Sequence, residues 1–279
     1  MNWMDLPEEY TKENSYFKIL PISYEQATTY GDGASKGPEE IIKASKHLEY
    51  YEDQFNNEPF TKGIHILPEL KLNSTPEDMV KQVSETVSNQ KGFLVSLGGD
   101  HAITIGTVKG LEEDFSVLVF DAHSDFRNEW NGSKLNHACV SKQISKNHDL
   151  ALIGIRSQDI EEHNEITNNS NIHQLKSYDF SVEKLKELLP KLKEKVYISI
   201  DVDVFDPPFL KNTGTPEPGG LQWDQIINSL EEIFKQKEVI GADIVEFAPK
   251  ENFRTEAYSL ARLVYKIFSL KLKNILNRS

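Results

Sequence analysis

Acidic residues and a histidine directly follow an apolar run in VLVFDAHSDF, residues 117–126. Asp121, His123 and Asp125 occupy alternating positions there. Carboxylates and an imidazole at this spacing could bind a metal ion or transfer protons in a reaction. They could also be a helix cap and a surface turn, which is a common role for an acid after a strand. Taken alone, the stretch leaves its chemistry open.

The same arrangement recurs after other apolar runs. Asp100 and His101 follow GFLVSLGG, Asp201 and Asp203 follow VYISI, and Glu246 comes near the end of VIGADIVEF. In an open α/β sheet, ligands bind where loops converge at the carboxyl ends of the strands. We therefore expect these ionisable groups to meet along one edge of a sheet.

Carboxylates and imidazoles gathered at one edge would repel and desolvate each other unless a cation held them. Oxygen and nitrogen ligands without cysteine favour a divalent ion such as Mn²⁺ over thiolate-bound zinc. Six ligands are too many for one ion that keeps a position open for water, whereas two ions with shared carboxylates would use all of them. The candidate ligands are His101, Asp121, His123, Asp125, Asp201 and Asp203.

The elements that position these residues are predicted by seven short apolar runs with helical patterns between them. This alternation is typical of βαβ units, so we predict a single three-layer α/β/α domain over residues 1–279 with a large, mainly parallel central sheet. The runs begin at Phe17, Gly63, Gly92, Ser116, Ala151, Val196 and Val239. Helices are expected over 77–87, 183–195, 222–234 and 254–273.

Two irregular stretches, 125–142 and 206–220, interrupt this pattern. Long connections without secondary structure in a compact domain are usually functional, so both are candidate active-site loops. No repeat, low-complexity tract or Gly/Ser linker indicates a second domain.

Composition narrows the class of partner. The net charge of −13 over 279 residues argues against binding to nucleic acid and favours a small cationic ligand. No apolar stretch has membrane-spanning length, and the acidic N-terminus does not resemble a secretion signal, so we expect a cytoplasmic protein that does not bind membranes. The single cysteine, Cys139, fits a reducing compartment and is expected to be a buried side chain rather than a nucleophile.

Five motifs resemble the successive signatures of the ureohydrolases, the family of arginase and agmatinase. They are GGDH (98–101), DAHSD (121–125), SIDVDVFDP (199–207), GTPEPGGL (214–221) and DIVEFAP (243–249). The resemblance extends from about Ile19 to the C-terminal helix. It implies an arginase-like fold, two Mn²⁺ ions per chain, hydrolysis of a guanidino group to urea and an amine, and a homotrimer or homohexamer.

The resemblance also implies roles for individual residues. The six candidate ligands named above match the family's manganese ligands. Glu246 matches the acid that receives the substrate's guanidinium, and His137, in LNHACV, matches a loop histidine credited with proton transfer. Asp125 would pass a proton as well as bind metal. The catalytic residues implied are therefore Asp125, His137 and Glu246.

Substrate choice is less constrained. Arg127 stands where arginases typically carry an asparagine, and the surrounding loop is more similar to prokaryotic agmatinases, which implies agmatine as substrate and putrescine, a polyamine, as product. Two positions depart from the family pattern. Lys211-Asn212 replaces the usual Pro-Gly, and Glu251-Asn252 replaces an aromatic-Asp pair. N1-aminopropylagmatine, guanidinobutyrate and arginine remain alternative substrates.

Three other classes of protein fit the sequence less well. A metal-dependent deacetylase of related fold would need adjacent histidines, and the chain has no His-His pair. An aspartyl phosphotransferase would carry its Asp-x-Asp motif after the first strand, not beyond residue 200. A regulatory homologue without activity would be expected to have lost a ligand or the guanidinium acid, and all of these positions are filled.

Overall fold

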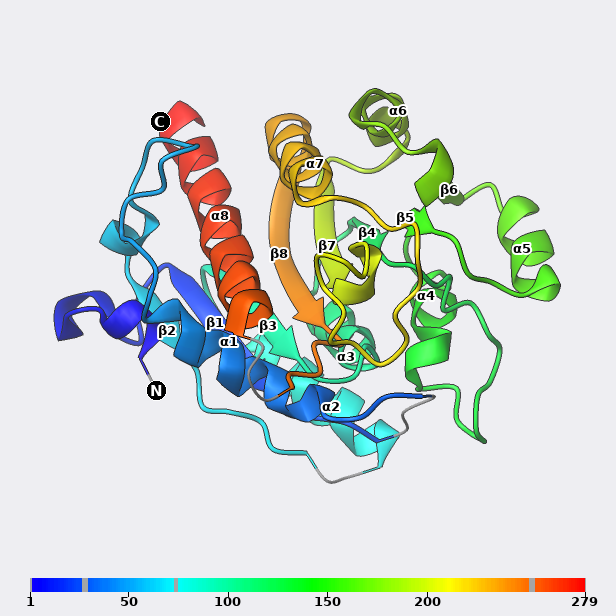
Figure 1. Cartoon of the computed structure of the whole chain (residues 1–279), viewed down its shortest axis with the longest axis horizontal. Coiled ribbons are helices and arrows are strands. Elements are labelled where there is room, and N and C mark those ends of the chain that lie inside the picture. Colours follow the sequence, from blue (N-terminus) through cyan, green and yellow to red (C-terminus); the bar gives the residue numbers. More distant parts are fainter. Residues whose placement is uncertain (1, 27–29, 73–74, 251–253, 279) are drawn as a thin grey trace.

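Parallel strands form one central sheet, and helices cover both of its faces (Figure 1). The computed structural model describes residues 2–26, 30–72, 75–250 and 254–278. Within these residues the sheet has eight strands in the order β2-β1-β3-β8-β7-β4-β5-β6, all paired in parallel. The strands are β1 (Phe17–Ile22), β2 (Ile64–Ile66), β3 (Phe93–Gly98), β4 (Ser116–Phe120), β5 (Leu150–Ile155), β6 (Ile172–Lys176), β7 (Lys195–Asp201) and β8 (Glu238–Val245).

The predicted architecture of one three-layer α/β/α domain is confirmed, with a sheet that is wholly rather than mainly parallel. All seven predicted strands are present, and the sequence prediction missed β6. That strand lies at the edge of the sheet, and four of its five residues are only half-buried, so it lacks the continuous apolar run of a central parallel strand.

The described residues form eight α-helices, and the four predicted helices are among them. They are α1 (Gly37–Ser45), α2 (Pro76–Ser88), α3 (Ile103–Gly110), α4 (Val140–Ile144), α5 (Ile160–Thr167), α6 (Val182–Leu188), α7 (Trp223–Gln236) and α8 (Arg254–Arg278). The helix predicted over 183–195 ends early, because Pro190 lies in a 3-10 turn that follows α6. Helix α4 begins inside the predicted irregular stretch 125–142, whereas 206–220 contains no helix or strand.

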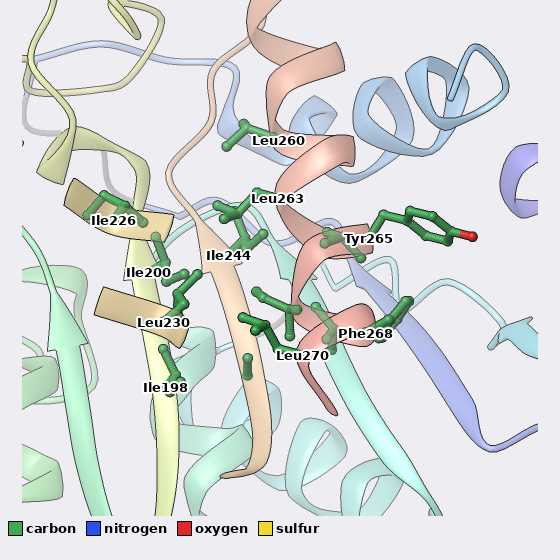
Figure 2. Close-up of a cluster of buried hydrophobic side chains, with 14 of the residues drawn as sticks. Ile198, Ile200, Ile226, Leu230, Ile244, Leu260, Leu263, Tyr265, Phe268 and Leu270 are labelled. Carbon is green, nitrogen blue, oxygen red and sulfur yellow. The ribbon is translucent and has the colours of Figure 1, made fainter. Parts of the chain in front are cut away.

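Alternating residues of the central strands build two separate cores. In β4, Val117 and Val119 face the core formed with α2, α3, α4 and α5, while Leu118 and Phe120 face the core formed with α1, α6, α7 and α8. Figure 2 shows the second core, where Ile244 of β8 lies between α7 and α8. The sheet is therefore held rigidly from both sides, which fixes the ends of its strands.

The four central strands, β3, β8, β7 and β4, are adjacent in the sheet although they are far apart in sequence. Their carboxyl ends lead directly into the GGDH, DIVEFAP, SIDVDVFDP and DAHSD motifs, so the topology brings four motifs to one edge. None of the helices in the described part of the chain has the length and apolarity needed to cross a membrane.

Candidate metal centre

Three carboxylates surround one histidine nitrogen at the end of the central strands. His101, which precedes α3, is fully buried. Its Nδ1 lies 3.3 Å from Asp121 Oδ2, 3.3 Å from Asp201 Oδ2 and 3.1 Å from Asp125 Oδ2. Nδ1 nevertheless makes no hydrogen bond of acceptable geometry with any of them. Three carboxylate oxygens therefore lie close to one buried imidazole nitrogen that has no hydrogen-bond partner.

A second cluster lies beside the first. His123 Nδ1 is 2.9 Å from Asp203 Oδ2 and 3.8 Å from Asp121 Oδ1. Asp203 is almost completely buried, and its other oxygen, Oδ1, accepts a hydrogen bond from the backbone N–H of Ala122. The two clusters therefore share one residue, Asp121, whose two carboxylate oxygens face different histidines.

This donor set fits two metal ions. The groups His101–Asp121–Asp201 and Asp121–His123–Asp203 each bring potential ligand atoms within 4.8 Å of one another. Two of these atoms, His101 Nδ1 and Asp121 Oδ2, are buried and lack a hydrogen-bond partner, which is unusual for polar groups in a protein interior. The donors are nitrogen and oxygen only, which suits a hard or borderline divalent cation. Asp121 belongs to both groups, so it would be a ligand shared by the two ions.

The buried carboxylates of the centre shift the pKa values of their neighbours. Burial alone would lower the pKa of His101, but the adjacent Asp121, Asp125 and Asp201 raise it well above its usual value. Burial, reinforced by neighbouring acids, raises the pKa of both Asp121 and Asp201 well above the ordinary carboxyl range. In each case a positive charge among the carboxylates, from a proton or a metal ion, would relieve the conflict.

A buried hydrogen-bond chain orients His101 from the opposite side. Its Nε2 lies 3.0 Å from Ser199 Oγ in β7, and the Ser199 hydroxyl donates to Asp243 Oδ1 in β8 at 2.6 Å. Because Ser199 gives its proton to Asp243, His101 must donate from Nε2, which directs Nδ1 into the centre. Asp243 also accepts a hydrogen bond from Tyr197.

Glu246 lies where β8 ends and holds a strained backbone conformation. Its φ of 66° is in the left-handed region, which is costly for a residue other than glycine. Two contacts hold it there: its backbone N–H donates to Gly99 O at 2.7 Å, and its Oε1 accepts from the backbone N–H of His101 at 2.6 Å. Burial, together with Asp100 and Asp201, raises the pKa of its carboxyl well above the usual range.

His137 approaches the centre from a 3-10 turn, His137–Cys139, which lies in the predicted loop 125–142. Its Nδ1 is 3.8 Å from Asp100 Oδ2. Burial would lower its pKa, but Asp100, Asp125 and Glu246 raise it. Cys139 is buried, and burial raises the pKa of its thiol to about 11, consistent with the predicted unreactive side chain.

One cavity of about 320 Å³ joins these groups, a size suited to a small ligand. Among the candidate site residues, only Asp121 does not line it, because Asp121 lies behind the others. The outer wall contains Arg127, whose guanidinium stacks 4.5 Å from the Trp130 ring and pairs with Asp159 at 2.6 Å. Glu25 closes another side, and its carboxylate accepts hydrogen bonds from Gly33 and Ser35.

The structure thus brings all the predicted site residues together: His101, Asp121, His123, Asp125, His137, Asp201, Asp203 and Glu246. The support that Ser199 and Asp243 give to His101 is not among the sequence-based predictions. A signal was available, because both are polar residues inside otherwise apolar strands and both lie within the quoted motifs. Of the two departures from the family pattern, Lys211-Asn212 is described, while Glu251-Asn252 lies outside the described residues.

Comparisons with known proteins show what the whole chain is similar to. A model of the arginase family matches residues 15–269. An agmatinase from Pyrococcus horikoshii is 34% identical over 276 residues, which cover 97% of this chain and 96% of that protein. An N(1)-aminopropylagmatine ureohydrolase from Synechocystis is 35% identical over 269 residues, which cover 89% of this chain and 87% of that protein. The crystal structure of agmatine ureohydrolase of Thermoplasma volcanium superposes with a TM-score of 0.87, at 28% identity, over 96% of this chain and 93% of that chain.

Proposed function

The chain belongs to the arginase family of hydrolases, and from that premise we propose that it is a two-manganese ureohydrolase that converts agmatine to urea and putrescine. The observation that carries the proposal is the position of Asp121. Its two oxygens face the His101 and His123 clusters separately, in a centre that adjoins the Glu246 carboxylate. A pair of divalent ions bound there would lower the pKa of a water molecule and stabilise the negative charge that develops during attack.

Glu246 would bind the cationic end of the substrate. Its carboxylate lines the cavity next to the candidate ligands, and one oxygen is fixed by the N–H of His101. A guanidinium that docks against it would form charge-assisted hydrogen bonds and would favour the ionised carboxyl despite burial. Such contacts would present the guanidino carbon at a fixed distance and orientation, which a poorly electrophilic, resonance-stabilised carbon requires.

The reaction adds water to the guanidino carbon and breaks the bond to the alkyl nitrogen, so that R–NH–C(NH₂)₂⁺ and H₂O become R–NH₃⁺ and urea. The alkylamine must be protonated to leave. Asp125, with Oδ2 directed at the metal centre, would take a proton from the attacking water and deliver it to the leaving nitrogen. His137, which lines the same cavity, would exchange protons with solvent.

N1-aminopropylagmatine is a second candidate substrate. The relative from Synechocystis that carries this activity in its name is 35% identical, against 34% for the agmatinase. The outer wall of the cavity contains more acidic than basic groups, since Glu25, Asp159 and Glu162 accompany Arg127. This charge favours a cationic tail on the substrate over a carboxylate tail, as in arginine or guanidinobutyrate.

Urea release from a panel of guanidino compounds tests the proposal. Manganese-loaded protein is offered agmatine, N1-aminopropylagmatine, guanidinobutyrate and arginine. We expect kcat/KM to be highest for a compound with a cationic tail. Faster release from arginine than from agmatine would overturn the substrate assignment, and no urea from any compound would overturn the proposed reaction.

A further inference from the structure

The segment that departs from the family pattern, Lys211-Asn212, is attached to the C-terminal helix by one buried carboxylate. Glu256, in the first turn of α8, has only 5% of its surface exposed. Its Oε1 accepts hydrogen bonds from the backbone N–H groups of Lys211, at 2.9 Å, and Asn212, at 3.3 Å. Its Oε2 accepts a third from the side-chain amide of Asn212. A chain with glycine at position 212 would lack the hydrogen bond from the side-chain amide to Glu256 Oε2.

This contact satisfies a group that would otherwise be costly. A buried carboxylate destabilises a fold unless hydrogen bonds compensate for its lost hydration. Three N–H donors from the loop, and the position of Glu256 near the positive end of a 25-residue helix, provide that compensation. The loop and the helix are thus fixed to each other through Glu256 and Asn212.

The opposite side of the same loop contacts the segment that carries Glu246. The Asn212 carbonyl accepts a hydrogen bond from the backbone N–H of Ala248 at 2.9 Å, and Thr213 forms an antiparallel bridge with Phe247. In Figure 1 the loop (yellow) passes beside the chain that leaves β8 (orange). Since Phe247 and Ala248 directly follow Glu246, these bonds help to maintain its left-handed backbone.

The loop also borders the Glu246 carboxylate in the cavity. A Cβ atom placed on Gly214 would lie 3.7 Å from Glu246 Oε2, so the backbone of Gly214 forms the wall opposite that oxygen. Gly214 lines the cavity together with Glu246, and its carbonyl accepts a hydrogen bond from Gly31. A shift of the loop by a few tenths of an ångström would therefore change the space in which a guanidinium docks.

We propose that Asn212 and Glu256 are positioning residues that set the geometry of the guanidinium site through the loop and Glu246. The proposal rests on the proposed function, because it takes Glu246 as the group that receives the guanidinium. The hydrogen bonds that define the Asn212–Glu256 contact involve none of the candidate metal ligands. Disturbing it should therefore weaken substrate binding without changing metal content.

A reciprocal substitution tests this. Asn212→Asp places two carboxylates against each other in a buried site, whereas Glu256→Gln in the same chain restores a donor and an acceptor. For Asn212→Asp we expect KM for agmatine to rise about tenfold, with kcat changed less than about threefold and the manganese content unchanged. In the double variant Glu256→Gln/Asn212→Asp, KM should return to within about threefold of wild type.

Two further variants complete the test, one as a control and one as a second probe of the contact. Asn171→Asp adds the same charge to an exposed loop residue before β6 and should leave KM unaltered. Asn212→Gly removes only the side-chain contact, at a backbone conformation that is not left-handed, and keeps the test decisive if Asn212→Asp does not fold. For this variant we expect KM to rise about threefold with kcat retained.

The proposal would be overturned if the double variant were impaired in kcat and KM as much as Asn212→Asp, or if KM were unchanged in both Asn212→Asp and Asn212→Gly. Its failure differs from failure of the proposed function. If wild-type protein releases urea from no guanidino compound, agmatine is not consumed and its Kd can be measured by calorimetry. Kd values that rank the variants in the order expected for KM would then support the positioning role. Equal Kd values in all variants would refute it.

Discussion

Ser199 supports His101 from behind, and its removal should be costly out of proportion to the size of one hydroxyl. Ser199→Ala deprives His101 Nε2 of its acceptor and Asp243 Oδ1 of its donor. Both residues are fully buried, so water does not replace the lost partners. An unsatisfied buried group costs about 1–3 kcal/mol, so two of them cost about 2–6 kcal/mol of stability. We expect a value toward the lower end, because Asp243 still accepts a hydrogen bond from Tyr197.

The same change should weaken metal binding. Without the Ser199 acceptor the imidazole is free to rotate or to change tautomer, and loss of such outer support typically lowers metal affinity about 10–100-fold. Differential scanning calorimetry of the metal-free protein measures the loss of stability. A loss of 1 kcal/mol lowers Tm by about 2–4 °C in proteins of about 150–250 residues. Titration calorimetry with Mn²⁺ measures the loss of metal affinity.

Ser229→Ala is the matched control for Ser199→Ala. Ser229 is equally buried, but its hydroxyl donates only to the Gln225 carbonyl within α7, so its loss should cost at most about 1 kcal/mol and leave manganese affinity intact. If Ser199→Ala matched Ser229→Ala in both measurements, the account of how His101 is oriented would be wrong.

Three other outcomes are expected. Saturating Mn²⁺ at about 100 times Kd should stabilise the fold by about 2.7 kcal/mol per site, and a chelator should reverse the rise in Tm; an unchanged Tm would contradict a metal centre. Lys266→Met leaves the buried carboxylate of Glu52 with one cation fewer and should lower the free energy of unfolding by about 3 kcal/mol, measured from the change in Tm. Lys193→Met breaks an exposed ion pair and should lower it by less than about 1 kcal/mol. Burial would raise the pKa of Glu25, but hydrogen bonds from Ser35 and Gly33 lower it below 4.5, so its stabilising effect is complete above pH 4.5 and is lost as pH falls through the folded-state pKa. The difference in Tm between wild type and Glu25→Gln should shrink over that range, and a constant difference would contradict it.

The sequence predicted the candidate site more completely than the surrounding fold. Central parallel strands are continuous apolar runs with ionisable residues at their ends, so the positions of Asp121, Asp201 and Glu246 could be read directly. The half-buried edge strand β6 and the short helices α4 and α5 lack such periodicity, and tertiary packing decides them.

Contacts between distant segments could not be predicted from one sequence. Glu256 is in the first turn of a helix, where an acid is ordinarily explained by the helix dipole, and Asn212 looked only like a departure from a glycine. Their contact depends on how α8 packs against the 206–220 loop. In the same way, the roles of Ser199 and Asp243 become visible only when β7 and β8 are paired.

The number of manganese ions bound per chain, measured together with the rate of urea release from agmatine, tests the central claim most directly. Asp121 faces two clusters, so we predict that activity rises with manganese and reaches its maximum at about two ions per chain. Asp121→Asn should lose both the second ion and urea release. Saturation at one ion with full activity, or urea release that persists in Asp121→Asn, would contradict the account.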